Sequence, residues 1–105
     1  MEKRPDWTTA EVEAVVADYF AMIEDHLSGR PFVKAEHTRL LQASLDGRTR
    51  RSVEEKRHNI GAVLAEQDLA WLPGYVPKHN YQQSLADCVI RYLAEQPELR
   101  ARLKP

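Results

Sequence analysis

The feature that most constrains the fold is a helical repeat of apolar side chains near the start of the chain. These side chains recur at spacings of three and four residues, which places them on one face of an α-helix: Val12, Val15, Val16, Tyr19, Phe20, Ile23 and Leu27. Thr8 and Glu11 have the spacing of a capping box, and Gly29 and Pro31 mark the end of the pattern. The sequence therefore predicts a long amphipathic helix near the start of the chain, whose apolar face must be buried against other segments.

Two further helices are predicted before the middle of the chain. The second runs from about Val33 to Leu45, and Gly47 stands where a helix commonly ends. The third begins at Thr49 or Ser52, and Ser52 has a glutamate three residues later, as in a second capping box. Its buried side is predicted to contain Val53, Ile60, Val63 and Leu64, and Gly61 inside it suggests a close approach by another segment.

Helical periodicity fails over residues 68–78, where two prolines and a glycine interrupt an apolar stretch. We expect an ordered loop there, with Trp71 and Tyr75 lying against the helices. A fourth helix is predicted to begin near Asn80, and Pro97 fits the first turn of a short final helix.

The predicted fold class is all-α. The 105 residues suffice for one domain, 1–105, built as a compact bundle of four main helices plus a short C-terminal helix. Helices two and three, joined at the glycine turn, are expected to be arranged like a helix-turn-helix. No stretch has strand alternation long enough to predict a sheet.

Composition narrows the setting. The net charge is −1, so the overall charge indicates no particular partner. A single cysteine cannot form an internal disulfide, so nothing indicates an oxidising compartment. The first residues lack the apolar core of a signal peptide, and no apolar run approaches the ~20 residues that span a membrane. We expect a cytoplasmic protein without a membrane contact, a cofactor or a metal.

No complete catalytic set is found. Cys88 falls on the apolar stripe of the fourth predicted helix, where a buried structural thiol is the simpler interpretation. The four histidines are scattered and form no metal-binding or nuclease spacing. The chain alone is therefore predicted not to be an enzyme.

The middle of the chain is basic. Residues 34–58 hold seven lysines and arginines against four acidic residues, a balance of +3, whereas residues 1–33 hold three against seven. In helix-turn-helix proteins the second helix enters the major groove and its first residues contact bases. A nucleic-acid surface here would comprise Arg48, Arg50, Arg51, Lys56 and Arg57 as phosphate contacts, with His58 and Asn59 as base or water-mediated contacts.

The competing interpretation of this segment is a solvated helix face with local ion pairs. Glu54 and Glu55 lie close enough along the helix to neutralise part of its charge. Against this, basic residues at a helix N-terminus oppose the helix dipole, which favours a functional reason for them.

Several motifs, in order, resemble the N-terminal segment of bacterial multidomain proteins that carry HNH-type nuclease or other restriction- and defence-associated domains further along. They cover about residues 7–93 and include Trp7-Thr8, Asp18-Tyr19-Phe20, Lys34-Ala35-Glu36-His37, Ser52-Val53-Glu54, Gly74-Tyr75 and Asn80-Tyr81-Gln82. The resemblance implies a domain of unknown function without the nuclease motif, which lies in the part of those proteins that has no counterpart here.

Two specific functions remain open on the sequence, beside a third possibility, a domain that only spaces or stabilises its fusion partners. The first is a non-catalytic module that binds or targets DNA, in a restriction or defence system. The second is a protein-interaction or dimerisation adaptor with an apolar patch around Trp71 and Tyr75. An exposed patch there would favour the adaptor, and burial of both aromatic side chains would count against it.

Overall fold

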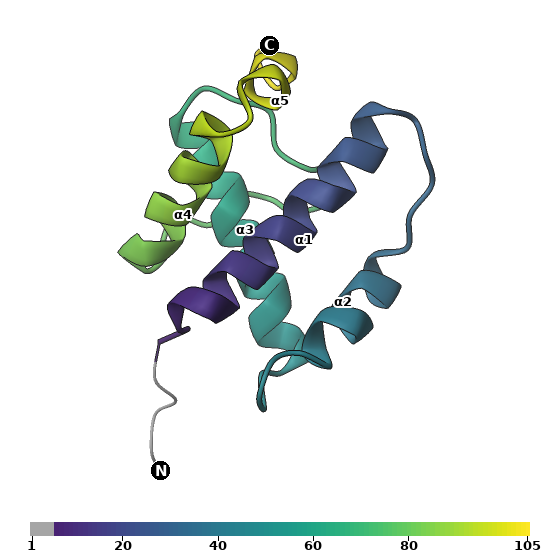
Figure 1. Ribbon diagram of the computed structural model, residues 1–105, viewed down its shortest axis with the longest axis vertical. Coiled ribbons are helices and arrows are strands. Elements are labelled where there is room, and N and C mark those ends of the chain that lie inside the picture. The colour runs from purple at the N-terminus through teal and green to yellow at the C-terminus, as the bar shows by residue number, and fades with distance from the viewer. Residues whose placement is uncertain (1–5) are drawn as a thin grey trace.

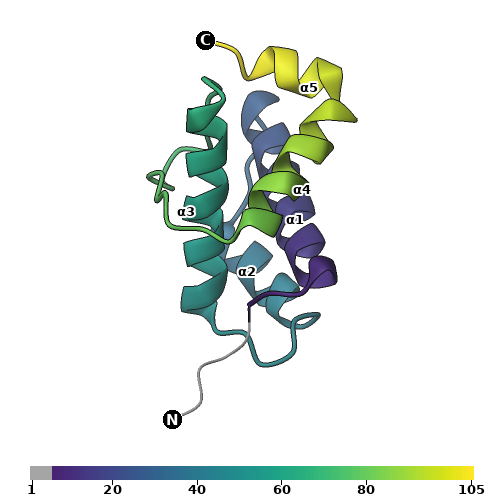
Figure 2. The same cartoon turned by 90° about the vertical axis from the view of Figure 1, so that its left-hand side faces the viewer.

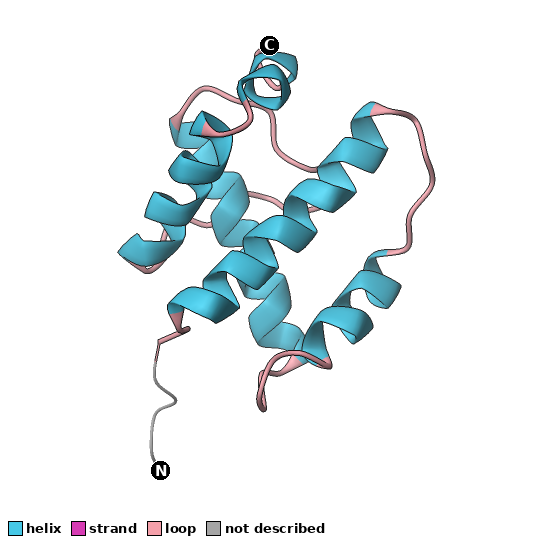
Figure 3. Ribbon diagram, viewed as in Figure 1, coloured by secondary structure: helices cyan, strands magenta, loops and turns pink. Residues whose placement is uncertain are grey.

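The computed structural model describes residues 6–105, and this part of the chain folds into helices and loops with no strand (Figure 3). The helices are α1 (Thr9–Leu27), α2 (Lys34–Gln42), α3 (Arg50–Glu66), α4 (Gln83–Ala94) and α5 (Pro97–Arg102). The predicted all-α fold of four main helices and a short C-terminal helix is confirmed. None of the described helices is long and apolar enough to cross a membrane.

The long helix α1 lies at the centre of the arrangement, with α2 on one side, α4 on the other and α3 crossing behind it (Figure 1). Its predicted cap is confirmed, because Thr8 Oγ1 accepts a hydrogen bond from the Glu11 amide and the Glu11 carboxylate accepts one from the Thr8 amide. The predicted apolar stripe is buried except for Leu27 at its end. Within this core the rings of Phe20 and Tyr92 stack at 4.6 Å, which joins α1 to α4.

Helix α2 is shorter than predicted and ends at Gln42. Gly47 lies in the turn that follows, at a φ of +69° that disfavours other residues. Thr49 caps α3 by accepting a hydrogen bond from the Ser52 amide. The second predicted capping box is wrong, because Ser52 already belongs to the first turn of α3 and its hydroxyl donates to the Thr49 carbonyl.

The loop between α3 and α4 lies along α3. The carbonyl oxygen of Tyr75 would be only 3.2 Å from a Cβ atom at Gly61, so the close approach expected at this glycine is found. Tyr75 is buried, as predicted, whereas Trp71 touches α3 beside Gly61 and leaves 42% of its surface exposed. Helix α4 begins at Gln83 and not near Asn80, so this predicted start is wrong. Its N-cap residue, Gln82, forms no capping hydrogen bond, and its side chain bonds to Trp7.

A buried guanidinium joins three helices and this loop. The Arg57 side chain of α3 has no exposed surface, and its Nη2 donates to Asp18 of α1 at 2.8 Å. Its Nη1 donates to the hydroxyls of Thr38 on α2 and of Tyr75. His37 of α2 reaches the same aspartate, with 2.8 Å between Nδ1 and Oδ1. A buried charge is stable only when it is paired and hydrogen-bonded, so these partners fix how α1, α2 and α3 meet.

Removal of the Asp18 charge is expected to destabilise the fold strongly. Asp18→Asn removes the nearer counter-charge of the buried Arg57 guanidinium and leaves only the partly exposed Glu54 carboxylate, 3.8 Å away. Breaking a buried ion pair typically costs about 3–5 kcal/mol. Urea denaturation followed by circular dichroism measures the loss. Glu36→Gln is the matched control, because it removes one negative charge from an exposed pair with Arg39 and should cost less than about 1 kcal/mol. Equal losses in the two variants would contradict the structural role assigned to Arg57.

Candidate nucleic-acid interface

The seven residues predicted to contact nucleic acid all lie on α3 or directly before it, but the structure divides them. Arg50 and Arg51 are exposed, and Lys56 and His58 are partly buried. Three others face the interior, with exposed fractions of 8% for Arg48, 0% for Arg57 and 2% for Asn59. The predicted surface is therefore reduced mainly to the first turn of α3.

Arg48 belongs to a cluster at the start of the chain. Its Nε and Nη2 atoms each donate at 3.0 Å to the Glu11 carboxylate, which also caps α1. The guanidinium lies over the Trp7 ring, 5.1 Å from its centroid. The prediction that Arg48 contacts phosphate is corrected, because the Arg48 side chain is buried and its charge is already matched by the partly buried carboxylate of Glu11.

Lys56 and Gln82 complete this cluster. The Lys56 ammonium donates to Gln82 Oε1 at 3.2 Å and lies 5.5 Å from the centroid of the Trp7 ring. The Gln82 amide also bonds to both the N–H and the C=O of Trp7. Burial lowers the pKa of Lys56 below its ordinary value. We call Trp7, Glu11, Arg48, Lys56 and Gln82 the N-terminal clasp, because they fasten the chain before α1 to α3 and to the start of α4.

Arg57 was expected to reach solvent, and this expectation is wrong. Position 57 lies four residues after Val53 and three before Ile60, so it falls in the middle of the buried stripe of α3. Its charge is balanced inside the protein by Asp18, and the carboxylate of Glu54 lies 3.8 Å away. Arg57 is therefore unable to contact a phosphate in this fold.

His58 and Asn59 hold the loop that follows α3. Asn59 Nδ2 donates to the Lys78 carbonyl at 2.7 Å, and His58 Nδ1 lies 2.7 Å from the Val76 carbonyl oxygen. The backbone N–H of Lys78 donates in return to the His58 carbonyl. The prediction of base contacts is corrected for Asn59, whose buried amide satisfies a loop carbonyl. His58 keeps a partly exposed ring.

Arg50 and Arg51 differ from the other basic residues of this segment. Both are exposed, and neither guanidinium forms a hydrogen bond or an ion pair with another described residue. The acidic residues expected to neutralise them face elsewhere: Glu55 pairs with Lys78 at 3.1 Å, and Glu54 lies toward Arg57. Two uncompensated positive charges thus stand at the N-terminus of α3, where the helix dipole opposes them.

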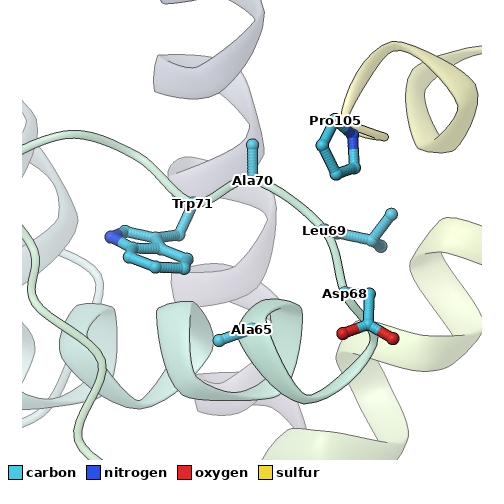
Figure 4. Close-up of a pocket in the computed structure, with 6 residues that line it drawn as sticks. All are labelled: Ala65, Asp68, Leu69, Ala70, Trp71 and Pro105. Atoms are coloured by element: carbon cyan, nitrogen blue, oxygen red, sulfur yellow. The ribbon is translucent and has the colours of Figure 1, made fainter.

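A second feature was only partly predicted from the sequence. Where α3 ends, an open and largely apolar hollow of about 480 Å³ is lined by Ala65, Asp68, Leu69, Ala70, Trp71 and Pro105 (Figure 4). The sequence analysis had placed an apolar patch around Trp71 but had not singled out Asp68, an acidic residue that follows the C-cap of α3, at a place where glycine is preferred.

Two other sequence predictions concern Cys88 and metal binding. Cys88 is buried, and burial raises the pKa of its thiol. Over residues 6–105 no three metal-binding side chains gather in one place. Comparison of the chain with protein-family models, with curated proteins and with solved structures found no match. The resemblance to nuclease-associated proteins therefore stays a prediction.

The N-terminal clasp should make stability depend on pH in the acid range. The Arg48 guanidinium, followed by the Thr8 amide, holds the pKa of Glu11 at about 2, below its ordinary 4.5. Because this carboxylate is more acidic when folded, its contribution is complete above pH ~5 and is lost as the pH falls toward ~2. Thermal unfolding followed from pH 6 to 2 should show a steeper loss for the wild type than for Glu11→Gln.

The matched control for this measurement is Glu13→Gln, at an exposed carboxylate on the same helix. It should retain the wild-type dependence on pH. A Glu11→Gln variant whose melting temperature still falls as steeply as that of the wild type would contradict the assignment.

Proposed function

We propose that the chain is a non-catalytic module that binds nucleic acid, DNA in the first instance, through the start of α3. The observation that carries the proposal is the pair of adjacent, exposed arginines without an internal partner, Arg50 and Arg51. Guanidinium groups suit phosphate because they donate two parallel hydrogen bonds and keep their charge at any physiological pH.

The position of the two arginines supports this function. Helices α2 and α3 are consecutive and pack on each other, and the arginines stand in the first turn of the second one. In helix-turn-helix proteins this turn approaches the nucleic acid. Each arginine costs stability here through the helix dipole, by about 0.3–1 kcal/mol in a typical case, and a bound anion would remove that cost.

The binding expected from this surface is weak and largely independent of sequence. Two phosphate contacts, or three if Lys56 takes part, correspond to a slope of about −2 to −3 when the logarithm of affinity is plotted against that of salt concentration. The resemblance to restriction- and defence-associated proteins supports a targeting role beside a separate catalytic domain. A cytoplasmic location, consistent with a single buried thiol, is part of the same proposal.

A salt titration of DNA binding tests the proposal. We expect the affinity of the wild type for a short duplex to fall as salt rises, and the double variant Arg50/Arg51→Ala to have a slope less steep by about 2. Fluorescence anisotropy of a labelled duplex measures both. The matched control is Arg100/Arg102→Ala, which removes two arginines of α5, at the opposite end of the molecule from the start of α3 (Figure 2).

The control should bind DNA as the wild type does. If the wild type fails to bind at low salt, or if the two double variants lose equal affinity, the arginines of α3 are not a nucleic-acid surface. Circular dichroism should show the same folded state in all three proteins. The Arg50 and Arg51 guanidinium groups form no hydrogen bond or ion pair with a described residue, and the pair that Arg102 forms with Glu24 is exposed.

The second candidate function, a protein-interaction adaptor, is favoured by one observation. Trp71 keeps 42% of its surface exposed beside an apolar hollow, which is unusual for the largest apolar side chain. The patch differs from the one expected, because Tyr75 is buried and contributes nothing to it. An adaptor would therefore use Trp71 and the end of α3.

A further inference from the structure

The hollow at the end of α3 has a fixed rim. The N–H of Ala70 donates to the carbonyl of Leu103 at 2.8 Å, which fastens the loop after α3 to the segment after α5. Leu69 and Leu103 are buried beneath this contact. Figure 4 shows Trp71 at one end of the hollow and Asp68 and Pro105 toward the other, with the small side chains of Ala65 and Ala70 between them. An apolar trough with an indole at one end and a carboxylate at the other is thus preformed.

Asp68 is locally unfavourable in two ways. Its φ is +57°, the left-handed conformation that follows a helix in the Schellman motif, with the Leu69 amide bonded to the Leu64 carbonyl and the Asp68 amide to the Ala65 carbonyl. Glycine occupies this position at lower cost because it has no Cβ. A negative charge also meets the negative end of the dipole of α3. Both penalties fall on the one charged side chain that lines the hollow.

The charge of Asp68 is not balanced inside the protein. The Asp68 carboxylate forms no hydrogen bond and no ion pair with another described residue, Lys104 included, although Lys104 precedes the lining residue Pro105. Together with the carbonyl groups at the end of α3, this carboxylate gives one end of the trough a negative potential. A ligand complementary to this end of the trough would therefore carry a positive charge.

We propose that the hollow binds an extended basic segment of a partner protein, with an apolar side chain placed on Trp71 and an arginine or lysine on Asp68. The apolar floor and the exposed indole supply contact area, and the carboxylate selects the positive charge and sets the direction of the peptide. This inference rests on the second candidate function, the adaptor, and names its partner class. It is independent of DNA binding.

The two candidate surfaces lie at opposite ends of one helix. Arg50 begins α3 and Ala65 lies fifteen residues further on, so a rise of 1.5 Å per residue separates them by about 22 Å along the axis. Figure 2 shows the helix running from one end of the molecule toward the other. A peptide on the hollow would leave Arg50 and Arg51 uncovered. The module could then hold a nucleic acid and a protein at the same time.

Selection from a phage-displayed library of random peptides, with the intact chain as bait, tests this inference. We expect enriched peptides to contain an arginine or lysine beside an apolar residue. A synthetic copy of one such peptide, titrated into the protein, should shift the indole N–H signal of Trp71 in NMR spectra. The indole of Trp7 is buried in the N-terminal clasp and serves as the internal control, since it should not move.

Three variants separate the contributions of the Trp71 contact area, the Asp68 charge and the backbone strain at Asp68. Trp71→Ala should weaken binding of the synthetic peptide at least about tenfold, because it removes the main contact. Asp68→Asn should weaken binding about fivefold, the loss expected for a partly exposed ion pair. Asp68→Gly should weaken it equally while unfolding at no lower temperature than the wild type, because glycine accepts the left-handed conformation.

Each other outcome overturns part of the proposal. Peptides that bind through Trp71 without a basic residue, or that bind Asp68→Asn unchanged, would leave the adaptor function standing and refute the basic partner. If no peptide is selected, or if a selected peptide binds the Trp71→Ala variant as tightly as the wild type, the adaptor function is refuted as well. A dimer in sedimentation velocity that Trp71→Ala dissociates would show that a second copy of the chain covers the hollow.

Discussion

The burial of the Arg57 guanidinium is the constraint on which the rest of the fold depends. A charged group removed from water needs a counter-charge and hydrogen-bond acceptors. For Arg57 these come from three places: the carboxylate of Asp18 on α1, the hydroxyl of Thr38 on α2 and the hydroxyl of Tyr75 in the loop after α3. Apolar contacts alone tolerate some sliding of one helix over another, whereas a fork of donors with fixed directions does not. One donor, Nε, lacks an acceptor among the described residues, so the network is dense but incomplete. The position of α2, which buries little apolar surface of its own, is set largely by these polar contacts.

The same logic explains why the basic middle of the chain offers so small an external surface. Arg48 and Lys56 are engaged in the N-terminal clasp, and Arg57 is engaged at the helix junction. The acidic excess lies in the first third of the sequence and the basic excess in its middle. This separation partly reflects ion pairs between acidic residues of α1 and basic residues of the segments that pack on it. Segregated charge in a small protein can thus reflect internal pairing. The two arginines that have no such partner are the ones that carry the case for nucleic acid.

The sequence predicted what depends on local rules and missed what depends on distant partners. Thr8 and Glu11 identified the start of α1, and Pro97 identified the start of α5, because caps and prolines act within one turn. Arg57 was misplaced because it is not itself one of the apolar positions of the third helix, although its spacing from Val53 and Ile60 puts it on the same face as they are. Its partner Asp18 lies 39 residues away, where no local pattern points. The start of α4 was placed too early, and the contact of its N-cap residue Gln82 with Trp7, 75 residues away, is likewise beyond any local pattern. Asp68 could have been noticed, because an acidic residue after a helix breaks a local preference.

The pairing of Gln82 with Trp7 also bears on the order in which the protein assembles. The Gln82 amide bonds to both the N–H and the C=O of Trp7, as a neighbouring strand would, and so closes a ring across 75 residues. Closing so large a loop is entropically expensive unless most of the intervening chain is already in place. The N-terminal clasp is therefore expected to form late in folding and to open early in unfolding, ahead of the junction around Arg57. The cap of α1 shares Glu11 with the clasp, so the first turn of the longest helix should fray whenever the clasp releases, while its centre stays protected.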